Sequence, residues 1–101
     1  MTAQDVLEKV AKSMVTVGLY KDVKTAIRAL ALEQIERKIA AYRGQVQELE
    51  RKYGRSLEEH SRFLEGKASM EEEEEWMEWQ GATVMLEAWQ RALQEVYNSA
   101  S

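Results

Sequence analysis

Apolar residues recur along this chain every three or four positions, and glycines separate the stretches in which they do so. This spacing is typical of amphipathic α-helices, whereas strict alternation would predict strands. The chain also contains no proline, a residue that helix interiors exclude. We therefore predict an all-α fold, a single domain over residues 1–101 with three to four helices at about residues 2–17, 22–53, 56–65 and 69–98.

The two longest predicted helices each carry a narrow apolar seam with alternating steps of three and four residues, the a/d spacing of coiled coils. In the second helix the seam consists of Ile35, Ile39, Tyr42, Val46, Leu49 and Tyr53. In the last helix it consists of Trp79, Ala82, Leu86, Trp89, Leu93 and Val96, with Trp76 at its border. Two such helices predict an antiparallel hairpin, and we assign these seams to a partner or dimer interface.

Helix starts are marked by side chains that cap free backbone N–H groups. Ser56 with Glu59, and Ser69 with Glu72, have the S-x-x-E spacing of a capping box. The five consecutive glutamates at 71–75 then fall at the start of the last helix, where negative charge is favoured. Because neighbouring helical residues point in different directions, these carboxylates do not converge on one ion. We predict a solvated helix start rather than a metal site.

Helix length bears on the oligomeric state. A helix of about 30 residues is roughly 45 Å long, whereas a compact chain of this size has a radius of gyration near 13 Å, hence a diameter of roughly 35 Å. The two long helices are therefore too long for a compact monomer, and a hairpin of them leaves apolar faces open. A second chain is the simplest cover, so we predict an intertwined homodimeric helical bundle.

The segment Met14–Val17 has an alternative interpretation as a short strand. A strand there, followed by a helix at Tyr20–Leu32, would be the arrangement of a ribbon-helix-helix DNA-binding unit. The basic residues of this half alternate with acidic ones, however, and form no continuous basic stripe. We therefore expect no direct nucleic-acid binding, and keep the regulator as an alternative.

Charge is distributed unevenly within a total of −4. Residues 1–55 carry a net charge of +4 and residues 56–101 a net charge of −8. One interpretation is that the two long helices attract each other when they pack. The other is that the acidic half docks on a basic partner.

Large aromatic and sulfur-containing side chains concentrate in the last predicted helix. Trp76, Trp79 and Trp89 are accompanied by Met77 and Met85, which widen the predicted seam. These side chains are suited to filling the core of a dimer. Tryptophan is also a preferred anchor in binding surfaces for other proteins. The sequence leaves both interpretations open.

Several chemistries are excluded by residue type. The absence of cysteine excludes disulfides, cysteine-based zinc clusters and thiol catalysis. The only histidine, His60, has Leu57 three positions earlier, where a di-iron bundle requires glutamate. No uninterrupted apolar run exceeds four residues, and the N-terminus lacks a secretory pattern. We therefore expect a cytoplasmic protein that is not an enzyme and has no catalytic, metal-binding or cofactor-binding residues, no small-molecule substrate and no membrane association.

Four stretches of the chain follow a recurrent family pattern: GLYKD (Gly18–Asp22), AIRALALEQIERKIAAY (Ala26–Tyr42), LERKYGRSLEEHSRFLEGKA (Leu49–Ala68) and EEEWMEWQGATVMLEAWQ (Glu73–Gln90). They resemble a family of small, all-helical prokaryotic and archaeal proteins, some of which lie beside a TumE-type toxin and are regarded as its TumA-like antitoxin. The resemblance covers about residues 18–92, and its most specific part is the K/R-Y-G-x-S-x-E-E segment at Lys52–Glu59.

This resemblance implies a non-enzymatic protein–protein interaction module, the antitoxin of a type II toxin–antitoxin pair, which neutralises a small toxin by helical packing. It also implies an intertwined helical dimer, in agreement with the length argument. Two alternatives stay open: a DNA-associated transcriptional regulator of ribbon-helix-helix type, and a structural helical dimer without a toxin.

Overall fold

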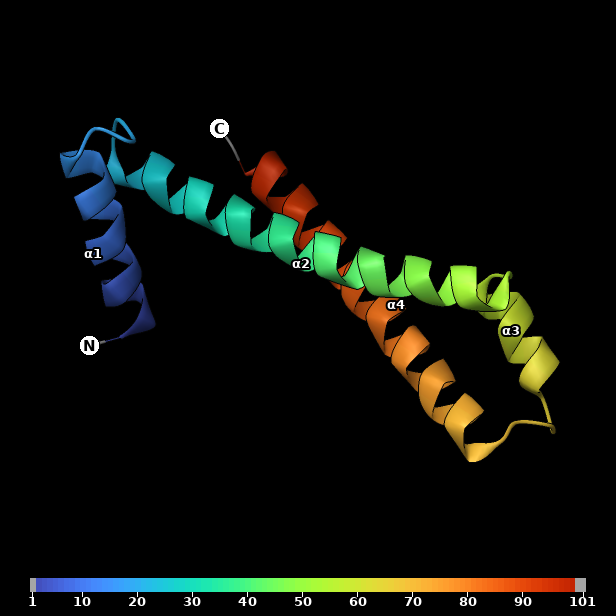
Figure 1. Cartoon of the computed structure of the whole chain (residues 1–101). Helices are drawn as coiled ribbons and strands as arrows, with labels where there is room; N and C mark the ends of the chain where they lie inside the picture. Colours follow the sequence, from blue (N-terminus) through green and yellow to red (C-terminus); the bar gives the residue numbers. More distant parts are fainter. Residues whose placement is uncertain (1, 100–101) are drawn as a thin grey trace.

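The computed structural model describes residues 2–99 as four α-helices, with no strand in this part of the chain (Figure 1). The predicted all-α fold is confirmed, and the predicted helix bounds differ from the observed ones by no more than one residue. The helices are α1 (Ala3–Thr16), α2 (Val23–Tyr53), α3 (Leu57–Leu64) and α4 (Met70–Asn98).

The helices begin where side chains cap the backbone. Thr2, Ser56 and Ser69 each form a capping box with the acidic residue three positions later. Asp22 caps α2 by accepting a hydrogen bond from a backbone N–H in the first turn. Gly54 ends α2 in the left-handed conformation, at φ 64°, which glycine adopts without strain. The boundaries are therefore encoded locally, which explains why they could be predicted.

The strand alternative for Met14–Val17 is wrong. The helix α1 runs unbroken from Ala3 to Thr16, and Val17 is its C-terminal cap. The hydroxyl of Thr16 donates a hydrogen bond to the carbonyl of Lys12, one turn earlier, as expected for a helical residue. The segment therefore lacks the strand that a ribbon-helix-helix unit requires.

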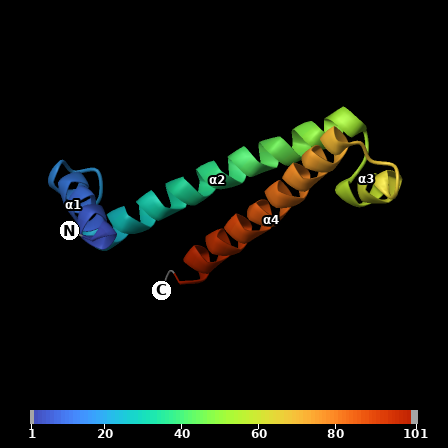
Figure 2. The same cartoon turned by 90° about the horizontal axis from the view of Figure 1, so that it is seen from below.

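The two long helices α2 and α4 run in opposite directions, cross at an angle and pack against each other, as predicted (Figures 1 and 2). The short helix α3 connects them at one end and contacts α4. The helix α1 contacts only the other end, where α2 begins. The buried side chains of the described parts of the two long helices are Ala26, Ile35, Ile39, Trp79 and Ala82.

The chain is elongated. Its radius of gyration is 19.1 Å and its principal dimensions are 59 × 29 × 19 Å, whereas a compact chain of this length has a radius of gyration near 13 Å. Its accessible surface is 7545 Å², against roughly 5,900 Å² for a compact monomer of this mass. This chain therefore exposes much more surface than a compact domain. No described helix is both long and apolar enough to cross a membrane.

Candidate protein-interaction surface

The predicted interface residues all lie on the inward side of the hairpin, and none is fully exposed. Ile35, Ile39 and Trp79 are buried within the single chain. The others are only partly buried: Tyr42, Val46, Leu49, Tyr53, Trp76, Leu86, Trp89, Leu93 and Val96. The two seams therefore supply the core of the hairpin, and the surface left for a partner lies mainly elsewhere.

One end of the hairpin is closed by an aromatic cluster, which consists of Tyr53, His60, Phe63 and Trp79. The imidazole of His60 lies 4.0 Å from the ring of Tyr53 and 5.4 Å from that of Trp79, measured between ring centroids. Phe63 stacks on the outer side of His60 at 6.3 Å. Because these residues come from α2, α3 and α4, the cluster holds the short helix against both long ones.

Among the described residues, His60 is the only buried side chain that is polar. Only 1% of its surface is exposed. Neither imidazole nitrogen has a hydrogen-bond partner within residues 2–99. Burial lowers the pKa of His60, and the nearby Arg55 lowers it further, against the opposing influence of Glu72 and Glu75. The side chain is therefore neutral at pH 7 and serves as a core aromatic ring.

A polar contact between α2 and α4 lies at the same end of the hairpin as the aromatic cluster. The ammonium of Lys52 lies 2.7 Å from a carboxylate oxygen of Glu75, and the hydroxyl of Tyr53 donates a hydrogen bond to the other oxygen. The hydrogen bond from Lys52 is the main cause that lowers the pKa of Glu75, and the hydrogen bond from Tyr53 lowers it further. The hydrogen bond to Glu75 in turn raises the pKa of Lys52. The prediction of a solvated glutamate run thus fails at Glu75, which faces α2.

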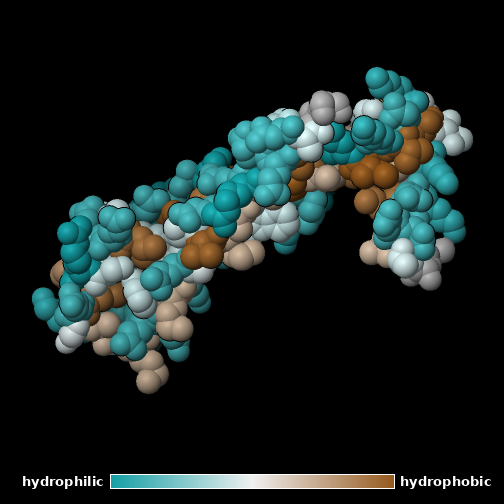
Figure 3. Space-filling model, turned by 180° about the vertical axis from the view of Figure 1, so that it is seen from behind, coloured by the Kyte–Doolittle hydropathy of each residue, from teal (hydrophilic) through white to brown (hydrophobic). Residues whose placement is uncertain are grey.

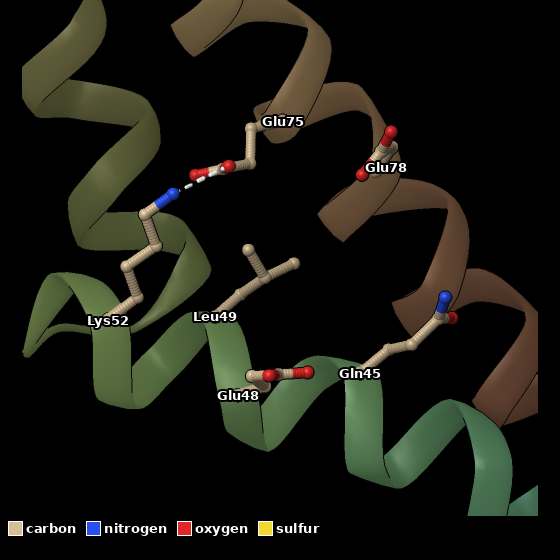
Figure 4. A pocket seen from close by; sticks show the side chains of 6 residues that line it. All are labelled: Gln45, Glu48, Leu49, Lys52, Glu75 and Glu78. Carbon is tan, nitrogen blue, oxygen red and sulfur yellow. Dashed lines mark hydrogen bonds and ion pairs between the residues drawn. The ribbon is translucent and has the colours of Figure 1, made fainter.

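This contact lies in a small polar pocket of about 280 Å³ between α2 and α4 (Figure 4). Its lining residues are Gln45, Glu48, Leu49, Lys52, Glu75 and Glu78. The one ammonium in the pocket is already paired with a carboxylate, as the dashed line in Figure 4 marks. Within the described residues, no three His, Asp or Glu side chains are placed to hold a metal ion.

The three tryptophans have different surroundings. Trp79 is buried in the aromatic cluster. The indole N–H of Trp76 donates a hydrogen bond of 2.6 Å to the hydroxyl of Ser61, which ties α4 to α3. Trp89 is partly buried, and its indole nitrogen has no hydrogen-bond partner in the described chain. All three therefore contribute to packing within the chain.

The outer side of α1 is the first apolar surface without a partner. Leu7, Val10, Met14 and Val17 follow each other at steps of three, four and three, and all but the partly buried Met14 are exposed, Val10 to 46% and Val17 to 71%. We call these four residues the α1 face. Figure 3 shows hydrophobic side chains gathered where α1 meets the start of α2, beside a hollow in the surface.

A second such surface lies on α4, turned away from the seam. It consists of Met77, Gly81, Val84, Met85 and Ala88, which we call the α4 outer face. Met77, Val84 and Met85 are 62%, 60% and 39% exposed, so the prediction that Met77 and Met85 widen the seam is wrong. Together with Leu57 of α3, four members of this face line a shallow groove of about 630 Å³. The sequence pattern does not indicate this face, because Gly81 and Ala88 contribute no large side chain to it.

No protein-family model, curated protein or solved structure matches this chain. The two exposed apolar surfaces are therefore the features of the chain that bear on its function.

Proposed function

We propose that this protein is a non-enzymatic protein–protein interaction module that acts in the cytoplasm as the antitoxin of a type II toxin–antitoxin pair. It neutralises a small toxin by packing helices against it. The observation that carries this proposal is the pair of unpartnered apolar surfaces, the α1 face and the α4 outer face, on an elongated chain. Exposed apolar surfaces of this extent are typical of proteins that bind other proteins.

The proposed active form is a homodimer. The chain exposes 7545 Å², roughly 1,600 Å² more than a compact monomer of its mass. A stable interface of standard size buries about 800 Å² on each partner. One dimer interface therefore accounts for about half of the excess surface and leaves the other half for a different partner.

The α1 face is the part best suited to a second copy. The flanking charges of α1 balance, since Asp5 and Glu8 are offset by Lys9 and Lys12. Two copies of such a neutral apolar helix can pair about a two-fold axis without net repulsion. The ribbon-helix-helix alternative loses its support, because the segment that should form its strand is helical.

A pull-down from native lysate tests the toxin-binding proposal. The tagged chain is incubated with nuclease-treated lysate, washed at high salt, and the retained proteins are identified by mass spectrometry. We expect one stoichiometric small protein that is toxic when expressed alone. Because apolar packing depends little on salt, whereas phosphate contacts weaken steeply, the high-salt wash also removes nucleic-acid carryover. Recovery of the bait chain alone contradicts the antitoxin role and leaves the homodimer.

A further inference from the structure

The α4 outer face combines an apolar groove with an acidic border. Eight glutamates and one arginine give α4 a net charge of −7. Of these glutamates, Glu72 caps the helix and Glu75 binds Lys52, whereas Glu73, Glu74 and Glu87 are exposed. Glu87 itself lines the groove. A ligand in this groove therefore meets apolar side chains at the centre and the carboxylate of Glu87 at the edge, with Glu73 and Glu74 exposed in the turn before Met77.

The floor of the groove favours a helix as its occupant. A Cβ atom added at Gly81 would meet no atom within 4 Å, so the backbone of α4 is open to close approach there. Gly81 and Ala88 lie two turns apart on the same side, and small side chains at such positions shorten the distance between packed helices. Met77 and Met85 flank them with flexible side chains that adapt to a partner's surface.

The negative charge of α4 determines which kind of helix the groove can bind. A second copy of α4 would place its own glutamates against these, and like charges across an interface disfavour association. The α1 helix of a second copy carries no net charge and gains nothing from the acidic border. We propose that the α4 outer face is the docking groove for a basic amphipathic helix of a partner protein. This inference rests on the proposed function, since it names the surface through which the toxin would bind.

A peptide-binding experiment tests the groove without the natural partner. The probe is a fluorescent amphipathic helical peptide of leucine and lysine, and its control is the same peptide with glutamate in place of lysine. Fluorescence polarisation is measured on the full chain and on V84E, with Q90E as the matched control, which adds a carboxylate to α4 outside the groove lining. Val84 is 60% exposed and Gln90 is also exposed, so neither substitution should unfold the chain.

The sign of the V84E effect separates docking from charge attraction. In the groove, V84E buries an added carboxylate against leucine side chains, and we expect the lysine peptide to bind about tenfold more weakly or worse. Simple attraction to an acidic surface would instead be strengthened or unchanged by the added negative charge. We expect Q90E to bind the lysine peptide like the unmodified chain, and the glutamate peptide to bind none of the three chains.

Three results would overturn the inference: no saturable binding of the lysine peptide, equal binding to V84E, or a V84E chain that loses its self-association. The last would show that the face belongs to a second copy, and it is read by light scattering on the same samples. The pull-down above reports on the proposed function independently. If the small toxin is captured equally by V84E and the unmodified chain, only the assignment of this surface fails.

Discussion

The two ends of the helical hairpin differ in how many of their side chains are buried or paired within the chain. At the α3 end, three helices meet in the aromatic cluster, and the contact of Glu75 with Lys52 and Tyr53 joins α2 to α4. At the α1 end, the fully buried residues of the described chain are the small Ala11 and Ala26. No side-chain hydrogen bond or ion pair links α1 to α2 within residues 2–99. The α3 end is a closed core, whereas the α1 end leaves apolar side chains exposed.

Removing Trp79 should produce the largest effect on the closed end. Trp79→Ala leaves a cavity where the indole is 1% exposed, and we expect the free energy of unfolding to fall by about 3–5 kcal/mol. Denaturant titration followed by circular dichroism measures this loss. The matched control is Val84→Ala on the exposed side of the same helix, which should change stability by no more than about 0.5 kcal/mol. Equal losses in the two variants would contradict the buried role of Trp79.

A charge on the α1 face should affect association rather than folding. Val10→Glu places a carboxylate at the centre of the α1 face, where the side chain is exposed in the single chain. We expect the dissociation constant of the dimer to rise about a hundredfold, because the carboxylate must be desolvated in the interface. Sedimentation or light scattering at micromolar concentration measures the change. If the unmodified chain is already a monodisperse 11.7 kDa monomer, the proposed dimer is wrong.

Sequence patterns predicted the helix bounds better than the contacts of the closed end. Capping boxes act between residues three apart, so they could be identified without the fold. Glu75, by contrast, is one of five consecutive glutamates, and only the rotation of α4 against α2 selects it to face Lys52. His60 occurs in a helix of eight residues, too short for its buried side to show as a period. Contacts between separate helices depend on tertiary packing, which no local pattern encodes.

Acid should loosen the closed end through His60. Its pKa is lowered in the folded chain, chiefly by burial, with Arg55 adding to the shift and Glu72 and Glu75 opposing it. The unfolded state therefore takes up the proton first, and the free energy of unfolding falls as the pH drops below about 6.5, the pKa of an unperturbed histidine. The loss continues until the pH reaches the lowered folded pKa.

The control for this pH dependence is His60→Phe, which keeps an aromatic ring and removes the titration. We expect its stability to be nearly flat between about pH 5.5 and 7.5, because the carboxyl groups with lowered pKa values lose their contribution only at lower pH. Urea titrations at several pH values, followed by tryptophan fluorescence, compare the two proteins. Parallel slopes for both would show that His60 does not carry the effect.

The ion pair at the closed end should contribute less than the ring packing. Glu75→Gln removes the charge that Lys52 contacts, while an amide oxygen can still accept the hydroxyl proton of Tyr53. Because Lys52 is largely exposed, we expect a loss of only about 1 kcal/mol, and less at high salt. Glu74→Gln, at the exposed neighbouring position, is the matched control and should change stability very little. If Glu74→Gln caused the larger loss of stability, the assignment of the inter-helix contact to Glu75 would be wrong.

The two helix-interior glycines give the smallest effect and separate the free chain from its complex. Neither Gly44 in α2 nor Gly81 in α4 has an atom within 4 Å of an added Cβ. Alanine at either site should therefore stabilise the isolated chain by about 1 kcal/mol through helix propensity, measured by denaturant titration. Gly81→Ala should nevertheless weaken binding of the lysine peptide, because its methyl group lies on the floor of the groove. Gly44→Ala should leave that binding unchanged. If both variants were stabilised and bound the peptide equally well, the α4 outer face would be an ordinary exposed helix surface. The α1 face would then be the remaining candidate interface of the chain.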